Sequence, residues 1–391
     1  MMTFEKKIAE FFEKNVLTIA FATGLIVSLL IRLSAYSFIS SDMSGFLIGW
    51  FGQIEQLGRF KALSVQVGNY SVAYQTLIAL MTYIPVDPVY QYKTLSVIFD
   101  YSLALGVYFL VFELKNHDRK IALLSFLAVV FSPLVFMNSS LWGQCDSIYT
   151  SFIVWSLYFF IKKKYPVSFI LYGLACAFKL QAVFFLPFLL FSYVRKKDFS
   201  IFNFLLIPFV MEFVCIPAMC VGRGFKAAFS VYYYQTGSCD KMYFSYPSFW
   251  ALFSDLKDIS LSRDFIDGMK IAAVLLTFSI IMILMCVMFL KKFTVNEKNA
   301  LYIAFILVYT CVLFLPGMHE RYGFVYEILA IAIAFLIPKT VWALVAISSL
   351  TCITYGISLF GNMNVTPLMS IINIIAYIYY IVVLYKSSEK E

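Results

Sequence analysis

The chain has 391 residues, of which 62% are hydrophobic, 19% aromatic and only 13% charged. Soluble domains carry about 25% charged residues, so this composition excludes a cytosolic enzyme, a secreted disulfide domain and a disordered chain. The net charge of +8 is explained by Lys and Arg in cytoplasmic loops and needs no nucleic-acid partner. Long, continuously apolar runs recur from Val16 to Tyr385, which indicates helices that span a membrane.

The apolar runs predict the spans in chain order. The run at 166–194 has basic clusters at both ends, so we expect a hairpin of two short helices with Lys179 and Gln181 near its turn. Counting it twice predicts an all-α polytopic membrane protein with about 12 crossings (11–13), built as one transmembrane domain over residues 1–391. The runs cover 16–38, 93–112, 121–137, 147–161, 166–194, 199–221, 268–290, 299–315, 323–337, 340–358 and 367–385.

Basic residues give the orientation, because short loops rich in Lys and Arg stay in the cytoplasm. They predict the cytoplasmic membrane as the location, with both termini in the cytoplasm. Two large outer segments follow, at 39–92 and 222–267. The stretch 71–86 is apolar but short, and counting it as a span would invert every later loop, so we interpret it as re-entrant or interfacial. Basic residues cluster at 6–14, 115–120, 162–164, 195–197 and 291–298, and recur at 339, 386 and 390.

The first outer segment opens with Asp42, directly after two serines. Apolar residues then recur at helical spacing around Trp50, which predicts a helix lying in the membrane interface. Asp42 would sit at the mouth of a membrane cavity. The alternative is that Asp42 simply caps this helix.

A second polar cluster, from Asn138 to Ser147, joins two predicted helices on the outer side. Asp146 and Ser147 are good capping residues, so capping is again an alternative. Capping alone does not explain Trp142 and Gln144. An aromatic ring beside an amide is suited to holding a sugar.

The third cluster reads GMHERY at 317–322 and also lies on an outer loop. Arg321 and His319 suit a phosphate at the membrane surface, because a guanidinium binds phosphate through two nitrogens. The alternative is a surface ion pair between Glu320 and Arg321, which would contribute little.

Lys179 and Glu212 are ionisable and fall inside apolar runs. Such residues are costly in a membrane and indicate function by default. They could instead pair with each other structurally.

Neither a glycine-rich phosphate loop nor an Asp-x-Asp pair is present, and the cysteines lack metal-binding spacing. If the protein is a transferase, we therefore expect a donor carried on a membrane lipid phosphate, no cofactor and no metal.

Taken together, these motifs resemble the GT-C class of multi-spanning glycosyltransferases, which use polyprenyl-phosphate-linked sugars. The sequence is most similar to the bacterial hexosyl- and mannosyltransferase-like members. The resemblance covers about residues 15–330. It rests on Ser41-Asp42 with FLIGW, on Gly68-Asn69-Tyr70, on WGQCDSIY, on GMHERYGF and, more weakly, on FKLQA at 178–182.

The resemblance implies that Asp42 is a general base for an inverting transfer of hexose. It assigns the donor phosphate to Arg321, His319 and Lys179. It implies sugar or acceptor contacts by Trp142, Gln144, Asp146, Glu320 and Tyr70. The chain lacks the large soluble C-terminal domain of the oligosaccharyltransferase branch, so we expect transfer of single sugars to an envelope glycan or glycolipid on the outer face.

Two alternatives stay open at this point. A transporter or flippase of lipid-linked glycans also has many helices, although such proteins usually show internal repeats. A polymerase or ligase of envelope glycans would share an outer active site but use a diphosphate-linked donor.

Overall fold

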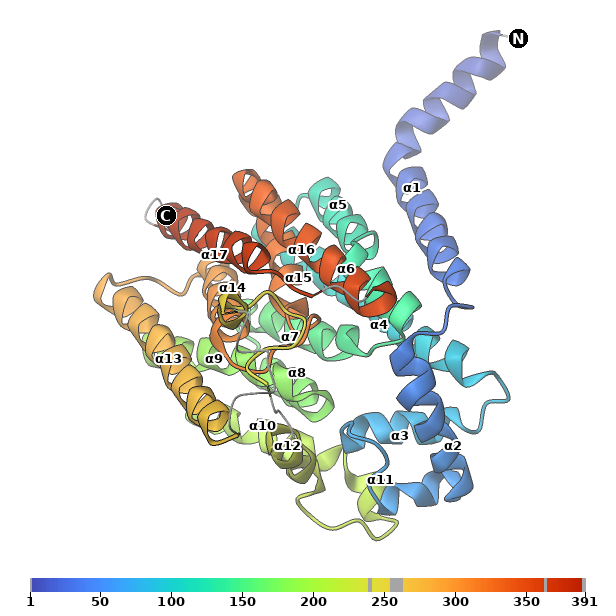
Figure 1. Ribbon diagram of the computed structural model, residues 1–391. Helices are drawn as coiled ribbons and strands as arrows, with labels where there is room; N and C mark the ends of the chain where they lie inside the picture. Colours follow the sequence, from blue (N-terminus) through green and yellow to red (C-terminus); the bar gives the residue numbers. More distant parts are fainter. Residues whose placement is uncertain (1, 238–240, 254–262, 362–363, 389–391) are drawn as a thin grey trace.

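The computed structural model describes residues 2–237, 241–253, 263–361 and 364–388 (Figure 1). The predicted all-helical fold class is confirmed for these residues, which form helices and one isolated bridge between Tyr243 and Met318. Part of the predicted outer segment 222–267 lies outside the described residues. The first half of the chain contains α1 (Met2–Ser34), η1 (Met43–Leu47), α2 (Ile48–Gln56), η2 (Arg59–Ser64), α3 (Val72–Met81), α4 (Pro88–Leu114), α5 (Arg119–Val130), α6 (Pro133–Phe136), η3 (Met137–Trp142), α7 (Asp146–Ile161), α8 (Tyr165–Phe178), η4 (Leu180–Phe185) and α9 (Leu186–Lys196).

The second half begins with short helices and ends with long ones. It contains η5 (Ile201–Leu205), α10 (Leu206–Phe213), α11 (Ile216–Met219), α12 (Ala227–Gly237), η6 (Phe249–Leu252), α13 (Arg263–Leu290), α14 (Glu297–Phe314), α15 (Phe324–Leu336), η8 (Pro338–Thr340), α16 (Val341–Phe360) and α17 (Pro367–Ser388). The start of α4 follows from its sequence. The Asp87 side chain accepts a hydrogen bond from the backbone amide of Val89, and Pro88 follows it. The helix α4 therefore starts with a capping residue and a proline.

Within the described residues, six helices are long and apolar enough to cross a membrane: α1, α4, α13, α14, η8 with α16, and α17. A seventh span is possible if α5 and the α6–η3 segment, which meet at a bend of 43°, count together. The chain is therefore a multi-pass membrane protein, but twelve crossings are not confirmed. The other predicted spans correspond to apolar helices of 10–17 residues, which are shorter than the approximately 20 residues of a full crossing.

Two local predictions can be compared with the helices. The 166–194 run is interrupted where expected: α8 ends at Phe178, and Lys179 has an extended backbone at φ −152° and ψ 138°. The 71–86 stretch contains α3, a helix of ten residues, which is about half the length of a crossing.

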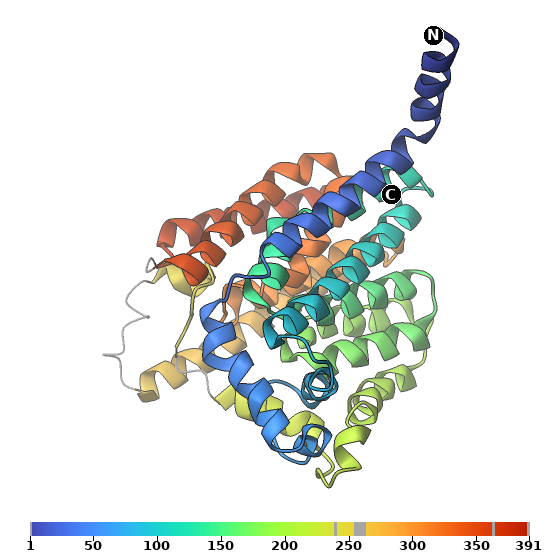
Figure 2. The same ribbon diagram turned by 90° about the vertical axis from the view of Figure 1, so that its right-hand side faces the viewer.

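The core of the bundle is formed by α4, α7, α14 and α15, whose apolar side chains pack into one cluster. In contrast, α1 lies at the edge, and its first half projects beyond the other helices in both views (Figures 1 and 2). In these views α2 and α3 lie at the end of the molecule away from both chain termini. The segment that opens with Asp42 is therefore placed at that end.

One buried carboxylate ties α1 to this core. Asp100, on α4, is fully buried and pairs with Arg32 of α1, with 3.1 Å between Arg32 Nε and Asp100 Oδ2. Ser139 donates to the same oxygen at 2.6 Å, and Ser147 donates to Oδ1. Asp100 thus connects α1, α4, η3 and α7 at a single point.

We predict that Arg32→Met strongly destabilises the protein, because it leaves the buried Asp100 without its cation. Removing one partner of a buried pair costs about 3–5 kcal/mol, which thermal unfolding of the purified protein in detergent will show as a lower Tm. The Arg32→Met/Asp100→Asn double variant should recover most of the loss, since the neutral Asn can accept from one serine hydroxyl and donate to the other. An unchanged Tm for Arg32→Met would contradict this role.

Candidate active site

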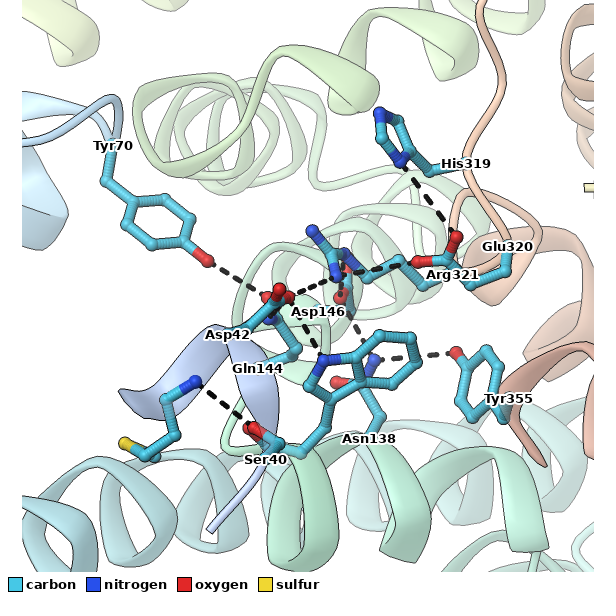
Figure 3. Close-up of polar contacts among 12 residues, drawn as sticks. Ser40, Asp42, Tyr70, Asn138, Gln144, Asp146, His319, Glu320, Arg321 and Tyr355 are labelled. Carbon is cyan, nitrogen blue, oxygen red and sulfur yellow. Dashed lines mark hydrogen bonds and ion pairs between the residues drawn. The ribbon is translucent and has the colours of Figure 1, made fainter. Parts of the chain in front are cut away.

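A cavity of about 380 Å³ gathers residues from distant parts of the chain. Its walls are the start of the first outer segment, the approach to α3, the η3–α7 loop, the α14–α15 loop and one residue of α16. Figure 3 shows the polar contacts among several of these residues, including Asp42, Gln144 and Arg321. All predicted site residues except Asp146 and Lys179 line it. The lining residues are Ser41, Asp42, Phe46, Leu47, Trp50, Asn69, Tyr70, Trp142, Gln144, His319, Glu320, Arg321 and Ser358.

Asp42 lies in the wall of this cavity with 30% of its side chain exposed. Three donors converge on its Oδ2: Trp142 Nε1 at 3.0 Å, Gln144 Nε2 at 2.7 Å and Arg321 Nη1 at 3.1 Å. In the described part of the chain, no hydrogen bond ends on Oδ1. The side chain caps no helix, so the capping interpretation is wrong. The carboxylate is held through one oxygen and offers the other to a ligand.

The η3–α7 loop delivers two of these donors in a fixed conformation. Gly143, between Trp142 and Gln144, has φ +75°, and a Cβ there would lie 2.3 Å from a methionine side chain, so the turn requires glycine. Ser40 donates to the Trp142 carbonyl at 3.0 Å, and Ser96 donates to the Gln144 carbonyl at 2.6 Å. The loop is thus anchored on both sides of the glycine.

Tyr70 extends this network across the cavity. Its hydroxyl donates to Gln144 Oε1 at 2.9 Å, while the same amide donates to Asp42. Burial raises the pKa of Tyr70 well above its ordinary value, so the phenol stays protonated as a donor. Its ring meets Trp50 edge-to-face with centroids 5.4 Å apart, which gives the cavity an aromatic wall.

Arg321 is the cation of the cavity wall. Besides Asp42, its guanidinium contacts Glu320 at 3.5 Å and Asp146 at 3.9 Å, and it lies 5.3 Å from the centroid of the Trp142 ring. Burial disfavours its charge, but these carboxylates outweigh burial and raise the pKa of Arg321 further. Burial also raises the pKa of Glu320, an effect that Arg321 only partly offsets. Glu320 is itself buried, so the alternative of a surface ion pair is wrong.

Asp146 and Lys179 lie behind the cavity wall. Asp146 is fully buried, accepts from Asn138 at 3.0 Å and forms an ion pair with Lys179. Its side chain caps no helix, which excludes the capping alternative. Lys179 therefore pairs with Asp146, and the alternative of a Lys179–Glu212 pair is wrong. Asp146 contacts Arg321 in the cavity wall, and Lys179 is linked to Arg321 through Asp146.

His319 stacks on Phe244, with ring centroids 4.1 Å apart and planes 10° from parallel. Its loop is held by the backbone of the second outer segment, since Phe244 N donates to Met318 O at 3.2 Å and Gly317 N donates to Met242 O at 2.8 Å. Burial and the nearby charges of Arg321 and Lys179 lower the pKa of His319 to about 3. This low pKa favours a neutral imidazole near pH 7, and the assignment of His319 to the donor phosphate stays a prediction.

The sequence interpretation missed the residues of α4 that position the site. Lys93, which is fully buried, donates to the carbonyls of Ala35, Tyr36 and Phe38 at 2.8, 3.1 and 2.6 Å, just before Asp42. From the same helix, Ser96 holds the η3–α7 loop, and Asp100 holds η3 and α7 on either side of this loop. Lys93 and Asp100 lay within or beside a predicted span, and ionisable residues in spans are the signal that identifies them.

Among the described residues, no three His, Cys, Asp or Glu side chains are grouped as a metal site. Asp42, Asp146 and Glu320 each contact Arg321 instead.

Comparison with known proteins places this site in context. The sequence model of glycosyltransferase family 87 matches residues 70–316. The chain belongs to glycosyltransferase family 87. Family 87 membership confirms the expected resemblance to membrane glycosyltransferases and makes the protein a glycosyltransferase. No curated protein matches the chain significantly.

The part that matches family 87 contains Tyr70, Trp142, Gln144, Asp146 and Lys179. Asp42 precedes it and the 319–321 cluster follows it. The cavity therefore contains residues from inside and outside the matched range, and the fold brings these residues together.

We predict that His319 makes the protein less stable in mild acid. Its pKa is about 3 in the folded chain and about 6.5 when unfolded, so the unfolded chain binds more protons between these values. The contribution of the neutral imidazole to the free energy of unfolding is fully present above about pH 6.5 and is lost as the pH falls towards 3. The Tm of His319→Gln should fall less than that of the wild type between about pH 7 and about pH 5.

The matched control is His117→Gln, because His117 lies on the surface with 62% of its side chain exposed. Its Tm should follow the wild-type curve. Identical pH dependence of the wild type and His319→Gln would contradict a neutral His319 with a lowered pKa.

Proposed function

We propose that the protein is an inverting glycosyltransferase that moves a single hexose from a polyprenyl-phosphate-linked donor to an envelope glycan or glycolipid. The proposed site is the Asp42 cavity, on the outer face of the cytoplasmic membrane, with both termini in the cytoplasm and about 12 crossings. The observation that supports this proposal is the carboxylate of Asp42, which three donors hold through one oxygen, one of them the guanidinium of Arg321.

In the proposed reaction, Asp42 Oδ1 accepts the proton of an acceptor hydroxyl. The freed oxygen forms a bond to the anomeric carbon from the side opposite the lipid phosphate. The bond between this carbon and the phosphate oxygen breaks, and its electron pair leaves with the phosphate. A single displacement inverts the anomeric configuration, and general-base help of this kind contributes about 10²–10⁴-fold.

The leaving phosphate gains negative charge, which a fixed cation stabilises without the reorganisation that water would need. Arg321 is the cation that lines the cavity, and Lys179 adds positive charge from behind through Asp146. The neutral His319, whose side chain is 34% exposed, contributes a hydrogen bond. The proposed step needs no metal ion.

The sugar is proposed to lie against the aromatic wall of Trp50, Tyr70 and Trp142. Flat rings bind the apolar faces of a sugar, while Gln144 and Glu320 offer polar groups for its hydroxyls. Asp146 is buried behind Arg321, so its proposed contribution is to position the guanidinium.

A transfer assay with several sugar donors tests the proposal directly. Purified protein is given polyprenyl-phosphate mannose, glucose or galactose, and in parallel GDP-mannose or UDP-glucose, with a membrane glycan fraction as acceptor. We expect transfer from a lipid-phosphate hexose and none from a nucleotide sugar, because the sequence has no nucleotide-phosphate loop. The product should have the anomeric configuration opposite to that of the donor.

Transfer from a nucleotide sugar alone would contradict the donor class, and retained configuration would contradict the single displacement. The protein reconstituted in lipid vesicles allows a glycosyltransferase to be distinguished from a flippase. Movement of lipid-linked sugar across the bilayer without sugar transfer would favour that alternative.

A further inference from the structure

Arg223 is fixed at the point where the chain leaves α11. Gly222 N donates to Met219 O at 3.0 Å and Arg223 N donates to Ala218 O at 3.0 Å, which are the two bonds of the Schellman motif at a helix end. Gly222 has φ +96°, a backbone conformation that a side chain would strain. This tight turn therefore fixes the backbone that carries Arg223 at the start of the second outer segment.

The side chain of Arg223 contacts the η2–α3 loop (residues 65–71) in the first outer segment. Its Nη1 donates to Val65 O at 3.0 Å and to Gln75 Oε1 at 3.1 Å, and its Nη2 donates to Gln66 Oε1. Gln75 belongs to α3, so the guanidinium joins the loop to the helix that follows it. A planar guanidinium presents several donors in fixed directions, which suits it to hold a loop in one conformation.

Hydrogen bonds continue from this loop to Asp42. Gln66 Nε2 donates to the backbone carbonyl of Tyr70 at 2.8 Å. The Tyr70 hydroxyl donates to Gln144 Oε1 at 2.9 Å, and Gln144 Nε2 donates to Asp42 Oδ2 at 2.7 Å (Figure 3). A continuous series of contacts therefore connects Arg223, in the second outer segment, with the carboxylate of the candidate site.

The η2–α3 loop also forms part of the cavity wall, where its position matters. Gly68 has φ +68°, and a Cβ there would lie 2.5 Å from the ring of Trp50. The ring of Tyr70 meets the same Trp50 with centroids 5.4 Å apart. From the other side, Gln235 Nε2 donates to the carbonyl of Asn69 at 2.5 Å. A shift of the loop would therefore move the aromatic wall.

We propose that Arg223 is a positioning residue of the Asp42 cavity. It holds the η2–α3 loop so that Tyr70 stands in the aromatic wall and orients the amide of Gln144. This role in sugar binding rests on the function proposed for the cavity. Because the Gln144 oxygen accepts from Tyr70, its nitrogen is the group that faces Asp42.

The contacts indicate which kinetic constant depends on Arg223. Trp142 and Arg321 donate to Asp42 from other elements, so the carboxylate keeps two of its three donors when the loop loosens. The aromatic wall has no such replacement for Tyr70. Loss of Arg223 therefore weakens binding of the sugar more than it slows the chemical step.

The first test is the transfer assay with polyprenyl-phosphate mannose, glucose and galactose. For the donor that the wild type uses, Arg223→Met should raise KM about 10-fold and leave kcat within about 2-fold. Arg223→Lys keeps the charge but loses the planar fork, so its KM should lie between these two. Gln66→Leu, at an exposed position, should raise KM to a similar extent and covers the case in which Arg223→Met does not fold.

The second test is hydrogen exchange of the backbone amides of residues 65–71, which needs no sugar transfer. Arg223→Met should exchange these amides about 10-fold faster, while the amides of α14 keep their wild-type rates. If the wild type transfers none of the sugars, the function proposed for the cavity fails, and the exchange rates still decide whether Arg223 holds the loop.

The matched control is Arg119→Met, the same change at an exposed position of α5, which should leave KM and exchange as in the wild type. Wild-type exchange in Arg223→Met would overturn the proposal. So would faster exchange with an unchanged KM, or a fall in kcat alone. A KM for Arg223→Lys equal to that of the wild type would overturn the assignment to the planar fork.

Discussion

The site depends on one fully buried carboxylate, that of Asp146. A charge without water must be paired, and leaving it unpaired costs several kcal/mol. Lys179 supplies one cation from the interruption between α8 and η4, and Arg321 supplies another from the α14–α15 loop. Because Arg321 also reaches Asp42, the buried charge indirectly places the carboxylate of the cavity. A single electrostatic requirement thus brings together segments that lie far apart in the chain.

The opposite side of the site is organised by α4 under the same constraint. Lys93, Ser96 and Asp100 are buried and spaced three and four residues apart, so they share one face of the helix. Lys93 holds the carbonyls that precede Asp42, Ser96 holds the η3–α7 loop, and Asp100 holds η3 and α7 on either side of this loop. The segments that carry Asp42 and its donors Trp142 and Gln144 are therefore all held by α4. A rigid support of this kind suits a base that must meet a substrate hydroxyl in one geometry.

The cavity residues could be predicted from the sequence because polar clusters stand out in a chain with so few charges. Asp42, Gln144 and Arg321 were identified in this way, and the structure brings them together. Their partners could not be predicted, since capping and tertiary pairing use the same residue types; Asp146 resembles a cap in sequence but pairs with Lys179. The number of membrane crossings could not be predicted from the sequence either. Helices such as α7 and α15 are too short for the length of their apolar run to show whether they cross the membrane. Lys93 and Asp100 were predictable in principle from their charge inside or beside an apolar run.

The central claim is that Asp42 acts as the base, and turnover of the Asp42→Asn variant measures it most directly. Asn preserves an acceptor for Trp142, Gln144 and Arg321 but cannot take a proton from the acceptor hydroxyl. The account predicts that kcat falls by about 10²–10⁴-fold while donor binding and Tm stay near their wild-type values. Asp118→Asn, in which an exposed capping residue of α5 is changed in the same way, should keep full activity. Wild-type turnover by Asp42→Asn would contradict the account.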